Sequence, residues 1–204
     1  MESKDQHIFP KPKTYSPMAH RKGDFLDMAH FVDVPQQFKQ SFIKKAEEVS
    51  VAKNRKERVS LLKSIFLDLD TYTKTHGISK DEIANARKEK AKIFGIFDEG
   101  VIGVKGEERK LVRDKYPKLP PKDGENYVYE KASISEFLTM LDLKLKEESS
   151  ELMIAVTREN RLEELSDTYE VLDSILKYRN IDMREITLSL QAKEITDRKK
   201  LQRK

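Results

Sequence analysis

Two short acidic clusters contain the side chains of this sequence that are best placed to do chemistry. The first consists of Glu147, Glu148 and Glu151, and the second of Glu164 and Asp167. Each cluster lies on a segment with helical periodicity, and folding the two helices as a hairpin would bring the carboxylates to one place. Carboxylate oxygens are the ligands that hard divalent cations take, so the pattern predicts a metal site, with magnesium as the natural ion.

Glu148 lies in the apolar stripe of the first of these helices. The stripe has the 3–4 spacing of a buried helical face and contains Leu138, Leu141, Leu145, Leu152 and Ala155. A carboxylate that faces a core is unfavourable unless another group pairs with it. Acidic helices are more often solvated surfaces, and the first cluster alone would be interpreted that way. The second cluster, at a hairpin's distance, favours the metal site.

Composition narrows the class of protein. The chain has no cysteine, which excludes a disulfide framework, a thiolate metal site and a cysteine nucleophile. No apolar run reaches the length of a membrane span and the polar N-terminus lacks a signal-peptide core, so we expect a soluble, cytoplasmic protein that does not bind membranes. The 40 basic and 36 acidic residues are too evenly balanced to indicate nucleic-acid binding.

Capping signals and hydrophobic periodicity predict helices over most of the chain. The expected capping pairs are Asn54 with Glu57, Ser79 with Glu82, Ser133 with Glu136, Asn160 with Glu163 and Asp182 with Glu185. Between residues 97 and 129 the helical period is lost, and strand-like pieces are expected at 101–104 and 127–129. Residues 1–24, which contain three prolines, are expected to form an extended arm.

The two halves of the chain resemble each other. Residues 48–90 align without a gap on residues 151–193, a shift of 103 positions, with 12 identities in 43 positions. The apolar positions largely correspond as well. This similarity predicts an internal repeat of three helices. The counterparts of Glu147, Glu148, Glu164 and Asp167 in the first copy are Lys44, Lys45, Leu61 and Ser64. Only the second copy is therefore expected to hold a divalent cation.

The Glu-Glu-x-x-Glu…Glu-x-x-Asp pattern at 147–167 resembles the metal-binding signature of the MazG superfamily of all-α nucleoside triphosphate pyrophosphohydrolases. Residues 110–117, Lys-Leu-Val-Arg-Asp-Lys-Tyr-Pro, resemble the Lys-Leu-Val-Arg-Asp-Lys-Ile-Pro opening of its phosphoribosyl-ATP pyrophosphohydrolase-like branch. Residues 180–186 and 77–83 resemble the turn of that branch into its third helix. The resemblance covers nearly all of the second copy and residues 40–102 of the first.

The resemblance implies an enzyme that requires magnesium or manganese and cleaves between the α- and β-phosphates of a nucleotide. Its metal ligands would be Glu148, Glu151, Glu164 and Asp167. Glu147 would be an auxiliary ligand or would orient the attacking water, so that Glu147 and Glu148 are the expected catalytic residues. The base and sugar of the nucleotide stay open.

Basic residues near the motif are candidates for holding phosphates, because charge-assisted hydrogen bonds from Lys and Arg match phosphate oxygens. They are Lys110, Arg113, Lys115, Lys193 and Arg198. A surface ion pair is an equally good interpretation of each one singly. The branch usually has Arg-Gly-Gly-Phe after its third helix, and Arg-Lys-Lys-Leu stands at 198–201 instead. The two glycines of the branch are absent there, which affects the ability of this loop to close over a substrate.

The fold expected from the resemblance is all-α, with tandem repeats that pair within the chain as a pseudo-dimeric four-helix bundle and a short β-like connector. The expected parts are the arm at 1–24, a structural repeat at 25–104 and a metal-binding repeat at 105–204. A further homodimer stays open. Two other functions also stay open, namely a protein that sequesters a nucleotide without turnover and a helical interaction module with structural acids.

Overall fold

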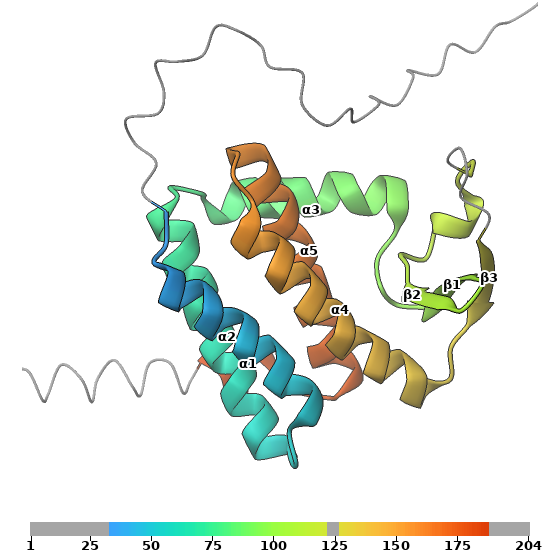
Figure 1. Cartoon of the computed structure of the whole chain (residues 1–204), viewed down its shortest axis with the longest axis horizontal. Coiled ribbons are helices and arrows are strands. Elements are labelled where there is room, and N and C mark those ends of the chain that lie inside the picture. Colours follow the sequence, from blue (N-terminus) through green and yellow to red (C-terminus); the bar gives the residue numbers. More distant parts are fainter. Residues whose placement is uncertain (1–32, 122–126, 188–204) are drawn as a thin grey trace, which may run out of the picture. The chain divides into compact units, whose positions relative to one another are not determined.

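The computed structural model describes residues 33–121 and 127–187, and these are mostly helical (Figure 1). The helices are α1 (Gln36–Val51), α2 (Arg55–Thr75), α3 (Lys80–Phe94), α4 (Ile134–Ile154) and α5 (Arg158–Tyr178), with a short 3-10 helix η2 (Tyr116–Lys118). Residues 183–187 are again helical. The expected arm at 1–24, Lys193 and Arg198 lie outside the described residues. The expectation of a helical protein is confirmed.

Capping side chains fix where the helices begin. The Asn54 side chain accepts from the Glu57 backbone N–H at 2.9 Å, and α2 starts at the next residue. Ser79 and Glu82 form the full capping box at the start of α3. Ser133 caps α4 in the same way by accepting from the Glu136 N–H. These three predicted starts are confirmed.

The start expected for α5 is wrong by three residues. Its cap is Thr157, whose hydroxyl accepts from the Asn160 N–H at 3.1 Å, so Asn160 lies inside the helix. Thr157 aligns with Asn54 under the shift of 103 residues, so the alignment of the two halves predicts the correct position. Threonine is a weaker cap than asparagine, which explains why the local signal at Asn160 misleads.

Three short strands lie between α3 and α4. They are β1 (Val101–Lys105), β2 (Glu108–Leu111) and β3 (Val128–Lys131), in the antiparallel order β2-β1-β3. The first and third match the expected strand-like pieces. The second was not expected, because three of its four residues are charged and its strand conformation depends on pairing with β1. The sheet joins residues on both sides of the expected boundary between 104 and 105.

Two helical hairpins supply the core. In one α1 packs on α2, in the other α4 packs on α5, and α1 also packs on α4 (Figure 1). The residues with no exposed surface include Phe42, Leu62, Leu69, Leu141, Leu145, Leu152, Leu165 and Leu172. The Tyr72 hydroxyl of α2 donates to the Leu152 carbonyl of α4 at 3.2 Å. The expected apolar stripe of α4 is thus confirmed, and it carries Glu148 into the interior.

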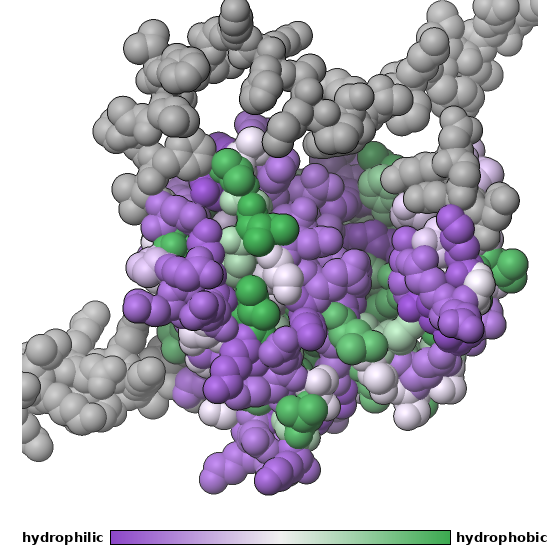
Figure 2. Space-filling view, in the orientation of Figure 1, coloured by the Kyte–Doolittle hydropathy of each residue, from purple (hydrophilic) through white to green (hydrophobic). Residues whose placement is uncertain are grey.

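Helix α3 packs on α5 through charged contacts as well as apolar ones. Arg87 donates to Glu170 at 3.0 Å and to Asp173 at 2.6 Å, and the sheet lies beside the start of α4 (Figure 1). Hydrophilic residues predominate on the face shown in Figure 2, with hydrophobic residues scattered among them. None of the described helices is long and apolar enough to cross a membrane.

Replacing Leu69 by Ala should lower the free energy of unfolding by about 2–5 kcal/mol, because Leu69 has no exposed surface and the truncation leaves a cavity. Urea denaturation measures the change. Leu143→Ala is the matched control, since Leu143 is 53% exposed on α4 and its truncation should cost well under about 1 kcal/mol. Equal losses in the two variants would contradict this assignment of the core.

Candidate metal centre

The acidic residues of α4 and α5 converge as the sequence predicts. Glu147, Glu148 and Glu151 form one group and Glu148, Glu164 and Asp167 a second, and within each group the carboxylate oxygens lie within 4.8 Å of one another. Glu148 belongs to both groups and joins them. The i, i+3 and i, i+4 spacing on each helix gathers these side chains on one side of it, with Glu148 buried, Glu164 and Asp167 half-buried, and Glu147 and Glu151 exposed.

Glu148 is the most buried of the five carboxylates. Its exposed fraction is 3%, and Oε1 accepts from Lys144 at 2.6 Å, whereas Oε2 is buried and has no hydrogen-bond partner among the residues that the structure describes. Burial raises the pKa of Glu148 to about 7, in spite of the charge on Lys144. A buried carboxylate oxygen without a partner is unfavourable, and a cation bound at Oε2 would remove that cost.

Glu164 lies beside Glu148 on the neighbouring helix and is half-buried. Burial raises its pKa to about 8, and the neighbouring charges of Glu148, Glu151 and Asp167 add to the shift. Within the part of the chain that the structure describes, its carboxylate has no ion-pair partner. Glu164 is therefore a second carboxylate whose ionised form requires an additional positive charge.

Asp167 differs because both of its oxygens are paired. Arg113 donates to Oδ1 at 2.5 Å, and Lys90 donates to Oδ2. Arg113 is itself buried, donates to the Gly95 carbonyl at 2.9 Å and lies 5.0 Å from the centre of the Phe97 ring. A metal ion bound by Asp167 would share this carboxylate with two cationic side chains.

Sequence reasoning missed two cations at this site. Lys144 contacts Glu147 at 2.9 Å as well as Glu148, one turn along the same helix, and the i, i+4 spacing was a usable signal for it. Burial lowers the pKa of Lys144, but the two carboxylates raise it by more, so that it stands above its ordinary value. Lys90 comes from α3 and is the counterpart of Lys193 in the repeat, which was the only hint of its role.

A cavity of about 260 Å³ is lined by three of the five carboxylates, Glu147, Glu148 and Asp167, and not by Glu151 or Glu164. Its charged lining consists of Lys90, Lys110, Arg113, Lys144, Glu147, Glu148, Glu163 and Asp167. Its apolar lining includes Phe94, Phe97 and Tyr116, and the rings of Phe94 and Tyr116 lie 6.1 Å apart and nearly parallel. Acids, cations and flat rings around one space are a combination that can contact a metal ion, phosphate groups and a planar base.

The candidate phosphate-binding residues separate into groups. Lys110 and Arg113 line the cavity. Lys115 does not, and its ammonium donates to the Lys92 carbonyl at 3.0 Å, near the end of α3. Lys193 and Arg198 fall outside the described residues. Glu151 does not line the cavity either, although it belongs to the first group of carboxylates.

The donor set fits a hard divalent cation. Both groups consist of carboxylates alone, which is the chemistry that Mg²⁺ and Mn²⁺ prefer, and the buried Oε2 of Glu148 is an acceptor without a donor. These acidic groups can therefore hold a metal ion. No family model matches the chain, and neither a curated protein nor a solved structure matches it.

Glu164→Gln should change stability in a pH-dependent way. Because the folded-state pKa of Glu164 is raised from 4.5 to about 8, its contribution to stability is complete below pH 4.5 and is lost as the pH rises through about 8. In EDTA the variant should match the parent at pH 5 and exceed it at pH 8.5 by about 1–2 kcal/mol, once solvent screening of this half-buried group is allowed for.

Urea denaturation at the two pH values measures this difference. Glu159→Gln is the control, because Glu159 is exposed in the first turn of α5 and its difference from the parent should be the same at both. Added Mg²⁺ should stabilise the parent more at pH 8.5 than at pH 5. A variant that is no more stable than the parent at pH 8.5 would show that burial and the neighbouring acids do not raise the pKa of Glu164 as described.

Proposed function

We propose that this protein is a metal-dependent nucleotide pyrophosphohydrolase that uses Mg²⁺ or Mn²⁺ and cleaves the bond between the α- and β-phosphates to give a monophosphate and pyrophosphate. One observation carries the proposal. The two segments that resemble the MazG superfamily are far apart in the sequence, yet Lys110 and Arg113 from one and Glu148 and Asp167 from the other line the same cavity. Glu148, Glu151, Glu164 and Asp167 are the proposed metal ligands.

A bound divalent ion would supply charge neutralisation at the phosphates and a water of lowered pKa. The other proposed roles belong to side chains of the protein. Glu147 is exposed beside Glu148 and is placed to orient a water and accept its proton. Lys110, Arg113 and Lys90 can donate to phosphate oxygens from the cavity wall. The flat rings of Phe94 and Tyr116 can hold a base without reading its edge, which favours tolerance for different bases.

A nucleotide-binding protein without turnover is the second candidate. It is favoured by the pairing of Asp167, whose two oxygens are already taken by Arg113 and Lys90. A metal ion would have to compete with both cations for this ligand. Cations that hold phosphates, together with acids that those cations hold in place, would suffice to bind a nucleotide.

Incubation with each of the common nucleoside triphosphates and Mg²⁺ or Mn²⁺ should release pyrophosphate. Glu164→Ala should lower the rate by at least about 100-fold, because a lost metal ligand costs at least as much as a lost supporting group. Its far-UV circular dichroism should be unchanged. Glu159→Ala is the control and should keep full activity. Orthophosphate as the product would place cleavage at another bond, and nucleotide binding without product would favour the second candidate.

We further propose that the chain consists of two copies of one helical unit that pair about a pseudo-two-fold axis. Two ion pairs support this. Arg55 contacts Glu185 at 2.6 Å, Arg158 contacts Glu82 at 2.6 Å, and a shift of 103 residues converts one pair into the other. Such reciprocal contacts are characteristic of a two-fold interface.

The backbone acceptors of these two arginines are equivalent as well. Arg55 donates to the Asn180 carbonyl and Arg158 to the Gly77 carbonyl, both at 3.1 Å. Gly77 and Asn180 are counterparts in the repeat, and both have positive φ angles, of 61° and 52°. Asparagine tolerates this left-handed conformation better than most residues, so the same helix end is compatible with two different residues.

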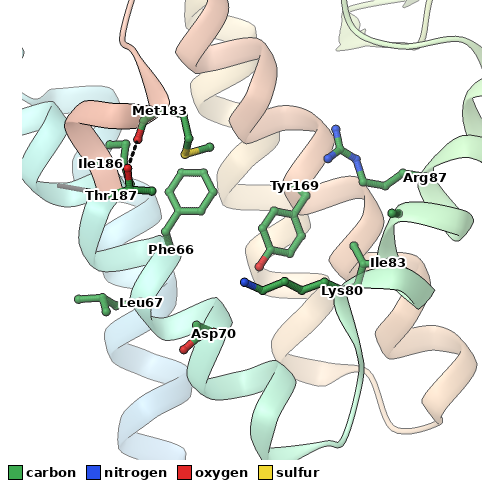
Figure 3. A pocket seen from close by; sticks show the side chains of 11 residues that line it. Phe66, Leu67, Asp70, Lys80, Ile83, Arg87, Tyr169, Met183, Ile186 and Thr187 are labelled. Carbon is green, nitrogen blue, oxygen red and sulfur yellow. Dashed lines mark hydrogen bonds between the residues drawn. The ribbon is translucent and has the colours of Figure 1, made fainter. Parts of the chain in front are cut away.

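A cavity of about 440 Å³ lies where the copies would meet (Figure 3). The rings of Phe66 and Tyr169, which are counterparts, face it with their centres 6.1 Å apart. Its lining includes three further pairs of counterparts, Ile83 with Ile186, Lys80 with Met183 and Ala84 with Thr187. Equivalent positions around one space are expected at a pseudo-symmetry axis.

In the first copy a lysine stands where the second has the buried acid. Lys45, the counterpart of Glu148, contacts Asp68 at 2.6 Å, and both side chains are largely buried. At the position where the second copy has a member of the acidic cluster, the first copy thus has an ion pair. A structural role for the first copy is consistent with this exchange.

Residues 105–204 expressed alone should self-associate or be poorly soluble, because the α4 surface that packs on α1 would be exposed. Size-exclusion chromatography with light scattering measures the oligomeric state. Mixing the fragment with residues 1–104 should suppress the self-association. A monomeric, stable and fully active fragment would rule out the intramolecular pairing.

A further inference from the structure

We infer that Lys144 is a movable counter-ion of the acidic site, which neutralises Glu148 when no metal is bound and donates to a phosphate group when metal and substrate are present. This inference rests on the proposed function for the identity of the phosphate. It assigns a role to a residue to which the resemblance gives none.

Within the described part of the chain, both ion pairs of Lys144 are with the acidic cluster. Its ammonium lies 2.6 Å from Glu148 Oε1 and 2.9 Å from Glu147 Oε1, and its side chain is only 17% exposed. Of the two Glu148 oxygens, Oε1 is therefore paired, and Oε2 has no partner within residues 33–121 and 127–187. A divalent ion held by this carboxylate would lie close to the ammonium, and the two positive charges would repel each other.

Arg113, the guanidinium of the same site, is held more firmly than Lys144. Arg113 is fixed by the Gly95 carbonyl and by the Phe97 ring in addition to Asp167. Lys144 has no such anchor among its described contacts, and it has a flexible four-carbon stem. It also lines the 260 Å³ cavity, so its ammonium can leave Glu148 without leaving the site.

The first copy provides an internal comparison. Where Glu148 is replaced by Lys45, the position of Lys144 is occupied by Ser41. The lysine is thus present in the copy that has the buried acid and absent from the copy that lacks it. This pairing within one chain indicates that Lys144 serves Glu148 and not the helix in general.

Lys144 in this role affects the affinity of the site for both metal and phosphate. A metal ion that binds without a phosphate compound must displace Lys144 from Glu148. It therefore binds more weakly than it would to the same carboxylates without the lysine. A phosphate compound that arrives with the metal gives the displaced ammonium a new partner, so the two ligands assist each other. Removing the ammonium should therefore tighten the binding of metal and weaken the binding of phosphate.

The test uses the full chain and the variant Lys144→Met, which keeps the apolar stem. Mn²⁺ binding is followed by electron paramagnetic resonance, and binding of imidodiphosphate, a pyrophosphate analogue that resists hydrolysis, is followed by calorimetry at saturating Mn²⁺. Relative to the parent, Lys144→Met should bind Mn²⁺ about tenfold more tightly and the analogue at least about tenfold more weakly. These opposite changes would not arise from a merely structural role.

Lys146→Met is the matched control, because Lys146 lies on the same helix, is half exposed and contacts Glu47 instead of the acidic site. Both affinities should be unchanged in it. Lys144→Arg keeps the charge and should retain much of the affinity for the analogue. Lys144→Gln replaces the methionine variant if that variant fails to fold.

Two results would overturn the inference. If Lys144→Met binds Mn²⁺ no more tightly than the parent, or neither protein binds Mn²⁺, the lysine does not compete with a metal. If the affinity for imidodiphosphate is unchanged, the lysine does not reach a phosphate. Neither measurement requires turnover, so a protein that hydrolyses no nucleotide can still satisfy both, and failure of the proposed enzymatic activity is distinguished from failure of this inference.

Discussion

The burial of one carboxylate, that of Glu148, is the constraint from which the rest of the site follows. Its helix places it between Leu145 and Leu152, which have no exposed surface, and the tight hairpin with α5 brings Glu164 and Asp167 against it. Acids in so little water need positive charge, and a helical hairpin alone cannot supply enough of it. The surrounding structure provides Lys144 from the same helix and Lys90 and Arg113 from outside the hairpin.

The small sheet and the end of α3 together position the side chain of Arg113. Strand β2 leads directly into this residue, and the Gly95 carbonyl holds its guanidinium. Gly95 has a φ angle of 79°, and a Cβ there would lie 2.9 Å from the Lys115 backbone nitrogen. Only glycine allows the segment after β2 to pass so close to the end of α3. The short sheet and the glycine turn at the end of α3 thus fix one buried cation, Arg113.

The features that could be predicted from the sequence are those that depend on residues close together in the chain. The caps at Asn54, Ser79 and Ser133 and the interruption of an apolar stripe by Glu148 are local patterns, and the structure contains them. Features that depend on distant partners were missed. Strand β2 exists because β1 pairs with it, and Lys90 reaches Asp167 because α3 packs on α5. No periodicity within α3 distinguishes Lys90 from the other lysines of that helix.

Lys90 also bears on the division of labour between the proposed copies. It belongs to the first copy, which lacks the acids, yet its ammonium contacts Asp167 of the second. If the copies pair as proposed, the first one is therefore more than a scaffold, because it supplies a charge to the cavity of the other. The loss of acids at the positions of Lys45 and Ser64 could then be tolerated, whereas loss of Lys90 would leave a half-buried carboxylate with one cation fewer. Selection on the two copies would accordingly act on different helices, on α3 in the first and on α4 and α5 in the second.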